Sequence, residues 1–160
     1  MTTTEPLPAA SGGLDAEEIR ALAQLADEVL ADRLDPMAAG LAPVFDAELW
    51  ATLEEAGLTL LGVPEEAGGG GAGPAAAAVA LSAGAFHAAP LPLAETELAG
   101  WLLAAAGLTV PAGPMTAAAG EVTAVPDGDG VRLSGRLDRV PWARDAALVV
   151  LATAGDAAGT

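Results

Sequence analysis

The chain has 160 residues, and 22 acidic residues against six arginines, with no lysine, give a net charge of −16. This charge argues against nucleic acids and anionic membrane surfaces as partners, because both require clustered cations. The absence of cysteine excludes disulfides and thiolate chemistry, and a single histidine leaves no credible metal cluster. We therefore expect a cytoplasmic protein of one domain, or of one small domain and part of another, without a membrane span.

The N-terminal residues 1–13 are small and polar, so we expect them to be disordered. A first helix begins at Asp15, with Glu18 at the position of a capping box. Apolar residues recur at helical spacing as far as Asp32. The pattern ends before Pro36, and a connector leads to the next helix.

The second helix carries signals at both of its ends. Asp46 is a candidate N-cap, and the flanking Phe45 and Trp50 are placed to form a hydrophobic staple. Gly57 lies where a left-handed C-cap is expected. Between the caps, one face of the helix is apolar, with Leu49, Trp50, Leu53 and Ala56.

Two further helices are predicted. Pro74 opens the third helix, which continues to Ala88. The fourth, Leu93 to Ala106, is apolar nearly all round, a pattern typical of a buried helix. We therefore predict that the rings of Trp50 and Trp101 are both buried.

After Gly107 the pattern changes to short strands. Glu121 to Val125 and Val131 to Ser134 flank Asp127 to Gly130, which predicts a hairpin with a four-residue loop. Ala147 to Ala152 is typical of a buried strand. Three strands leave edges and apolar faces open, so this region resembles an unfinished domain.

These elements predict an α+β fold. Residues 14–113 form an all-α helical domain, and residues 114–160 form an incomplete antiparallel β domain. A chain with such open edges is expected to be marginally stable and prone to self-association.

The order of motifs resembles that of a known family. A helix ending in E-x-G-L is followed by G-V-P-E-E-x-G-G-x-G at 62–71, and Ala83-Gly84 is followed by Pro90, Pro92, Glu95, Thr96 and Ala99. This order resembles the N-terminal helical domain of the acyl-CoA dehydrogenase family, from about Trp50 to Ala154. The resemblance implies an FAD-dependent α,β-dehydrogenation of an acyl-CoA thioester by a homo- or hetero-oligomer. In that family the carboxylate base lies in a C-terminal helical bundle, so no catalytic residue is assigned in this chain.

One segment is a candidate for contact with the flavin. Residues 134–143 resemble the family stretch N-G-x-K-x-W-I-[ST], which lies against the flavin, and Arg139 and Trp142 are therefore the cofactor-binding candidates. The surrounding stretch has a net positive charge, which could face a pyrophosphate. The alternative is that its arginines only balance nearby acids. They are Arg132, Arg136, Arg139 and Arg144.

Other chemistry-bearing residues have simpler interpretations. Glu95 and Glu97 precede or open the fourth helix, where the helix dipole favours anions, so neither is preferred as a base. His87, near a helix end, is expected to cap carbonyls or to be solvated. The glycine run at 68–71 lacks the lysine and hydroxyl of a phosphate loop, so we interpret it as a flexible connector.

Three functions remain open at this point. The chain is the N-terminal portion of an acyl-CoA dehydrogenase-like flavoprotein, without a base and inactive alone. Alternatively, it is a non-catalytic subunit of a heteromeric acyl-CoA dehydrogenase. The third possibility is an unrelated acidic helical interaction module.

Overall fold

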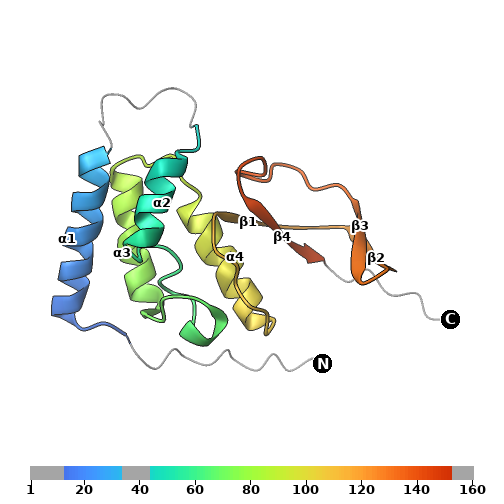
Figure 1. The fold of residues 1–160 in the computed structure, drawn as a ribbon, viewed down its shortest axis with the longest axis horizontal. Helices are drawn as coiled ribbons and strands as arrows, with labels where there is room; N and C mark the ends of the chain where they lie inside the picture. The colour runs from blue at the N-terminus through green and yellow to red at the C-terminus, as the bar shows by residue number, and fades with distance from the viewer. Residues whose placement is uncertain (1–12, 34–43, 153–160) are drawn as a thin grey trace.

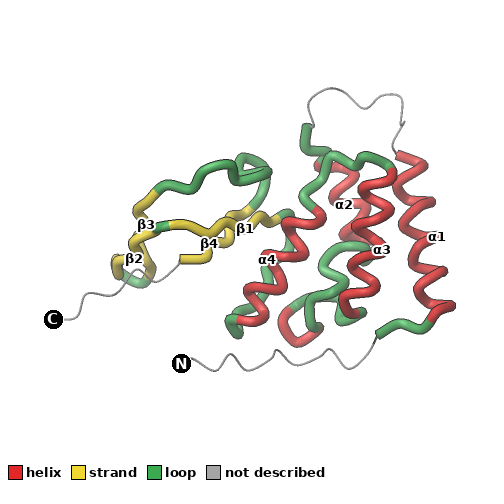
Figure 2. The backbone as a smooth tube through the Cα atoms, turned by 180° about the vertical axis from the view of Figure 1, so that it is seen from behind, coloured by secondary structure: helices red, strands yellow, loops and turns green. Residues whose placement is uncertain are grey.

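The computed structural model describes residues 13–33 and 44–152, and separates a group of helices from a group of strands (Figures 1 and 2). The predicted α+β fold is confirmed. The expected disorder of the N-terminal tail and the connector after Pro36 lie outside the described residues. In chain order the elements are α1 (Ala16–Arg33), α2 (Ala47–Glu55), the 3-10 helix η1 (Glu65–Ala67), α3 (Gly73–Phe86), α4 (Leu93–Ala105), β1 (Met115–Gly120), β2 (Val122–Asp127), β3 (Gly130–Gly135) and β4 (Ala147–Ala152).

The start of α1 is the predicted capping box. Asp15 Oδ1 accepts hydrogen bonds from the backbone N–H groups of Glu17 and Glu18, at 2.7 and 3.0 Å. In return, Glu18 Oε2 accepts the Asp15 N–H at 2.7 Å. These bonds to the ionised side chain lower the pKa of the Asp15 carboxyl.

Both predicted ends of α2 are confirmed. Asp46 Oδ1 accepts the N–H groups of Glu48 and Leu49, at 3.1 and 2.9 Å. At the other end, Gly57 has φ 68° and donates its N–H to the Glu54 carbonyl at 3.0 Å. The following N–H, of Leu58, bonds to the Leu53 carbonyl at 2.9 Å, which completes a Schellman motif.

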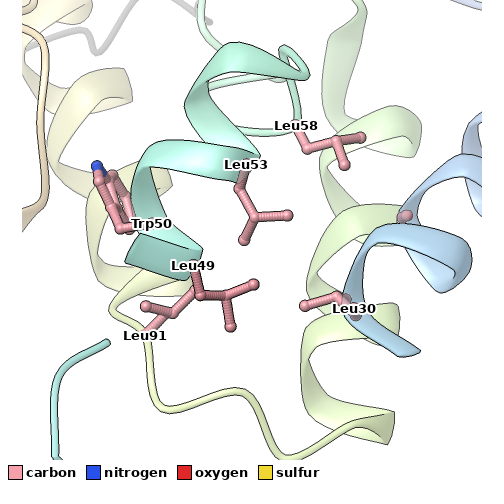
Figure 3. Packing of buried hydrophobic residues seen from close by; sticks show 7 residues of the cluster. Leu30, Leu49, Trp50, Leu53, Leu58 and Leu91 are labelled. Carbon is pink, nitrogen blue, oxygen red and sulfur yellow. The ribbon is translucent and has the colours of Figure 1, made fainter. Parts of the chain in front are cut away.

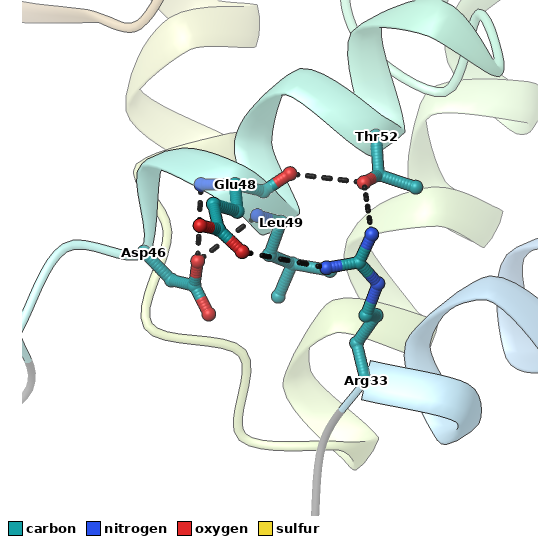
Figure 4. A network of polar contacts seen from close by, with 5 residues as sticks. All are labelled: Arg33, Asp46, Glu48, Leu49 and Thr52. Atoms are coloured by element: carbon teal, nitrogen blue, oxygen red, sulfur yellow. Dashed lines mark hydrogen bonds and ion pairs between the residues drawn. The ribbon is translucent and has the colours of Figure 1, made fainter.

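Arg33, at the end of α1, fastens that helix to the first turns of α2 (Figure 4). Its guanidinium lies 3.8 Å from Glu48 Oε2 and donates to Thr52 Oγ1 at 3.3 Å. The Thr52 hydroxyl in turn donates to the Glu48 carbonyl at 2.9 Å. The contacts are exposed, so they orient the two helices more than they stabilise them.

The core of the helical unit lies where α1, α2 and the segment before α4 meet (Figure 3). Trp50 is only 4% exposed, as predicted, and leucines surround it. The buried members of this cluster are Ala26, Leu30, Leu49, Trp50, Leu53, Leu58 and Leu91. A second cluster, which joins the helices to β1, consists of Leu60, Val63, Ala99, Val110 and Met115.

The predicted burial of Trp101 is wrong. Trp101 is 42% exposed and Leu98 is 51% exposed, because α4 turns its small residues towards the core. Gly100 approaches so closely that a Cβ would lie 2.6 Å from Leu60 and 2.9 Å from Val63. The apolar pattern therefore marked two faces, of which the described chain covers one. No described helix is both long and apolar enough to cross a membrane.

The predicted hairpin is confirmed, with a tighter turn. β2 and β3 pair in antiparallel fashion from Val122↔Gly135 to Asp127↔Gly130. The loop therefore has two residues instead of the expected four, because Asp127 and Gly130 already belong to the ladder. Gly128, in the turn, has φ 62°, which glycine adopts without steric cost.

The other strand pair departs from the predicted antiparallel domain. The predicted strand at β4 is confirmed, but it pairs in parallel with β1, from Met115↔Ala147 to Gly120↔Ala152. β1 was not predicted, since its sequence M-T-A-A-A-G has few β-branched residues. The pairing is parallel because the hairpin and the following loop carry the chain back to the start of β1.

A buried threonine joins β1 to α4. Thr96 is 1% exposed and lies on the inner face of α4. Its Oγ1 accepts the N–H of Met115 at 2.9 Å and donates to the Met115 carbonyl at 3.0 Å. One hydroxyl thus satisfies both backbone groups of the first residue of β1, which would otherwise be buried without partners.

Replacing Thr96 with valine keeps the side-chain shape but removes both hydrogen bonds. We expect Thr96→Val to lower the free energy of unfolding by about 2–4 kcal/mol, because two buried backbone groups lose their partner. Urea unfolding followed by circular dichroism measures this loss. Thr123→Val, on an exposed position of β2, is the matched control and should change stability by less than about 0.5 kcal/mol. Equal effects of the two substitutions would contradict the role of Thr96.

Candidate functional site

The glycine run is a connector, as predicted, but it is not loosely held. Residues 68–71 fold back on the segment before them, here called the strap (residues 60–71). Gly69 N–H bonds to the Pro64 carbonyl at 3.0 Å, Gly70 N–H to Leu60 at 2.9 Å, and Gly71 N–H to Val63 at 2.8 Å. These amides are used within the strap, so they are not free to bind phosphate.

The close packing of the strap explains one of its glycines. Val63 is fully buried, and a Cβ at Gly69 would overlap the Val63 backbone carbonyl and its Cβ. A side chain at this position requires movement of backbone atoms, which is costly in a packed interior. The glycine run is therefore a packing requirement of the helical unit.

Glu97 holds the strap against α4. Its Oε1 accepts the N–H of Gly62 at 2.6 Å, a long-range contact between helix and strap. Burial raises the pKa of the Glu97 carboxyl, and hydrogen bonds from Gly62 and Leu61 oppose that rise. Only Glu95 lies in the first turn of α4. The expectation that both acids sit at the helix dipole therefore holds for Glu95 and not for Glu97.

Glu97 also lines a small cavity between α2, α3 and α4. The cavity volume is about 10 Å³, roughly that of one water molecule. Trp50 and Thr96 contribute to its walls, and Trp50 Nε1 is buried without a hydrogen-bond partner. A thioester does not fit in this space, so the cavity does not bring Glu97 into contact with a substrate.

His87 connects two helices. Its backbone N–H caps α3 by bonding to the Ala83 carbonyl at 3.0 Å, as predicted. Its ring, however, is not solvated: the side chain is 8% exposed, and Nε2 lies 2.7 Å from Asp27 Oδ1 of α1. The histidine thus has a structural contact on each side, and no nucleophile lies beside it among these partners.

Arg139 and Trp142 lie together in the loop between β3 and β4, here called the cofactor loop (residues 136–146). Both have left-handed backbone angles, with φ 55° and 54°. Such angles are uncommon for residues other than glycine and cluster at functional sites. Arg139 is exposed and Trp142 is half-buried.

The positive stretch is partly neutralised. Arg132 donates to Asp127 Oδ2 at 2.7 and 3.1 Å, and Arg136 donates to Asp138 at 2.8 Å. These two arginines balance nearby acids, as the alternative interpretation expected. Within residues 13–33 and 44–152, neither Arg139 nor Arg144 takes part in an ion pair.

The Trp142 ring contacts a residue that sequence reasoning did not connect with the cofactor. Its centroid lies 6.4 Å from that of Phe45, with the rings at 68°, an edge-on arrangement. Phe45 also contacts Trp50, with centroids 6.4 Å apart and rings at 45°. No local signal could have revealed the contact, because Phe45 and Trp142 lie in distant parts of the sequence.

Comparison with known proteins identifies the helical unit. The family model described as "Acyl-CoA dehydrogenase, N-terminal domain" matches residues 16–109, more than half of the chain. The chain belongs to the acyl-CoA dehydrogenase family. The third possibility, an unrelated helical module, is therefore wrong. A comparison with curated proteins gives no significant match.

Two solved structures of acyl-CoA dehydrogenases are similar to this chain. The first, a variant of the Tcur3481–Tcur3483 steroid ACAD, is 34% identical, with a TM-score of 0.68 over 86% of this chain and 45% of that one. The second, the ChsE4–ChsE5 complex from Mycobacterium tuberculosis, is 26% identical, with a TM-score of 0.65 over 87% of this chain and 44% of that one. The chain thus spans less than half the length of these acyl-CoA dehydrogenase relatives.

The packing of the strap can be tested at Gly69. We expect Gly69→Ala to lower the free energy of unfolding by about 1–3 kcal/mol, because the added methyl group forces backbone atoms apart. Thermal unfolding provides the measurement. Gly13→Ala is the matched control, since a Cβ at Gly13 meets no atom within 4 Å. A Gly69→Ala protein as stable as the control would show that the strap is loosely packed after all.

Glu97 should make stability depend on pH. Because burial raises the pKa of Glu97, its contribution is fully present at low pH and is lost as the pH rises above about 4.5. We expect the free energy of unfolding to fall less steeply between pH 4.5 and 8 in Glu97→Gln than in the unmodified chain. Glu95→Gln, on the same helix, controls for the loss of one negative charge. Parallel pH profiles for Glu97→Gln and the unmodified chain would contradict the burial of this carboxyl.

Proposed function

We propose that the chain is the N-terminal part of a cytoplasmic acyl-CoA dehydrogenase subunit that works in complex with a second chain of the same family. The reaction is the α,β-dehydrogenation of an acyl-CoA thioester. The family match over residues 16–109 carries this proposal. Support for a heteromeric partner comes from the similar structures, of which one is described as a complex of two proteins, ChsE4 and ChsE5.

The cofactor implied by the family is FAD, which when bound accepts the β hydrogen as hydride. The cofactor loop offers chemistry that fits part of this group. Arg139 is exposed and lies in no ion pair of the described chain, so its guanidinium suits a pyrophosphate. Trp142 offers an aromatic ring for the flavin, although one edge of that ring is taken up by Phe45.

Removal of the α proton requires a carboxylate within hydrogen-bond reach of the α carbon. Glu97 is occupied by the strap and faces a cavity the size of a water molecule. Glu95 lies in the first turn of α4, where the helix dipole stabilises it as an anion. The base and the donors that polarise the thioester carbonyl therefore come from outside residues 1–160.

We extend the proposal to the substrate class. The first similar structure is described as a steroid ACAD and is 34% identical to this chain. A CoA thioester attached to a steroid is therefore the substrate that we propose to test first. Acyl-CoAs with straight chains serve as the comparison.

A second function, that of a non-catalytic subunit, is favoured by the cofactor loop itself. Pro141 stands where the family has a hydroxyl, and Trp142 falls three residues later than the family tryptophan. Two of the four arginines are paired with acids. In this case the chain would support the active site of its partner without holding a flavin of its own.

The purified chain alone should neither retain FAD after gel filtration nor oxidise steroid or straight-chain acyl-CoAs. The lack of a positioned base alone removes about 10²–10⁴ in rate. Adding the missing C-terminal half, in the same chain or as a companion acyl-CoA dehydrogenase subunit, should restore flavin absorbance and activity with an electron acceptor.

Arg139→Ala in that reconstituted protein separates the two functions. Loss of flavin supports a catalytic subunit that holds FAD through its cofactor loop. Retained flavin with full activity supports the non-catalytic subunit. A yellow and active 160-residue chain would overturn the proposal and direct attention to Glu95 and Glu97.

A further inference from the structure

Three aromatic rings form a continuous series from the helical core to the cofactor loop. Trp50 is buried on α2, Phe45 precedes the N-cap of that helix, and Trp142 lies beyond β3. Each ring centroid lies 6.4 Å from the next. This spacing is within the range in which aromatic pairs attract each other beyond simple burial.

The first two rings of the series are firmly placed. Phe45 and Trp50 form the hydrophobic staple of α2, and the hydrogen bonds to Asp46 fix the direction in which the chain enters the helix. Arg33 adds a contact from α1 to the same end of α2. Phe45 therefore presents its free edge at a position that the helical unit determines.

The third ring lies in a loop that needs such support. Arg139 and Trp142 both adopt left-handed backbone angles, which persist only when the surrounding structure holds them. On one side the backbone is held, since the Trp142 carbonyl accepts the N–H groups of Asp145 and Ala146 at 3.0 Å. On the other side the ring of Trp142 rests against Phe45.

We propose that Phe45 is a positioning residue for the cofactor loop, through its contact with Trp142. Whether this position matters for flavin rests on the proposed function; the contact itself does not. Because coupling is reciprocal, a cofactor held by Arg139 and Trp142 would also stabilise the start of α2. A residue of the helical unit thereby sets the conformation of a segment that the sequence places in the β region.

The contact is tested first in the 160-residue chain by a double-mutant cycle of Phe45→Leu and Trp142→Leu. Leucine at position 45 keeps an apolar contact with Trp50 but removes the aromatic edge. We expect a coupling of about 2- to 10-fold in the unfolding equilibrium constant, the size typical of an aromatic pair. Near-ultraviolet circular dichroism of Phe45→Leu should show an altered tryptophan signal, because Trp142 loses its aromatic neighbour. The far-ultraviolet spectrum should stay unchanged in both single variants.

Phe86→Leu is the matched control for the change of residue type. Phe86 is 81% exposed, and its ring contacts His87 and lies far from the cofactor loop in the fold. It should show no coupling with Trp142→Leu. Equal coupling for Phe45 and Phe86, or none for Phe45, would overturn the inference. If Phe45→Leu does not fold, Phe45→Met takes its place in the cycle, and the same coupling with Trp142→Leu is expected.

The second measurement is FAD affinity in the reconstituted protein. We expect Phe45→Leu to weaken FAD binding by about 2- to 10-fold, the same range as the aromatic coupling, and Phe45→Trp, which keeps a ring, to weaken it less. Coupling in the isolated chain with unchanged FAD affinity would support the positioning role and count against the proposed cofactor contact. The two failures are therefore distinguishable.

Discussion

The arrangement of the β region depends on one buried hydroxyl. Thr96 Oγ1 satisfies both the N–H and the carbonyl of Met115, and so fixes where β1 begins beside α4. β4 then pairs with β1 from Met115↔Ala147 onward, and the Ala147 N–H bonds to the Pro114 carbonyl at 2.9 Å. The start of β4 determines where the preceding loop must end. Through this sequence of contacts, a side chain of the helical unit places Trp142 within reach of Phe45.

The elements predicted most accurately are those whose signals are local. The capping box at Asp15 and the caps of α2 at Asp46 and Gly57 each depend on residues a few positions apart. β1 escaped prediction because an alanine-rich segment becomes a strand only when β4, distant in sequence, pairs with it. For Trp101 the error had another origin. Hydropathy shows that α4 is apolar, but only packing shows that its small residues face the core.

The candidate site divides in the same way. Arg139 and Trp142 were found through resemblance, because the family pattern is written in adjacent residues. Phe45 was not found, because its contact with Trp142 exists only after the strands and helices have assembled. Glu97 was grouped with Glu95 by sequence position, whereas a hydrogen bond from Gly62 gives it a separate role and environment. Long-range contacts of this kind have no signal within a short window of sequence.

The hydrogen bonds of the strap also limit how its length can vary. The N–H groups of Gly69, Gly70 and Gly71 each bond to a particular carbonyl among residues 60–64. Inserting or deleting one residue would move every donor past its acceptor and would place a side chain against Val63. Most surface connections accept insertions and deletions readily. This one should instead keep the same number of residues, so its length is as much a part of the motif as its glycines.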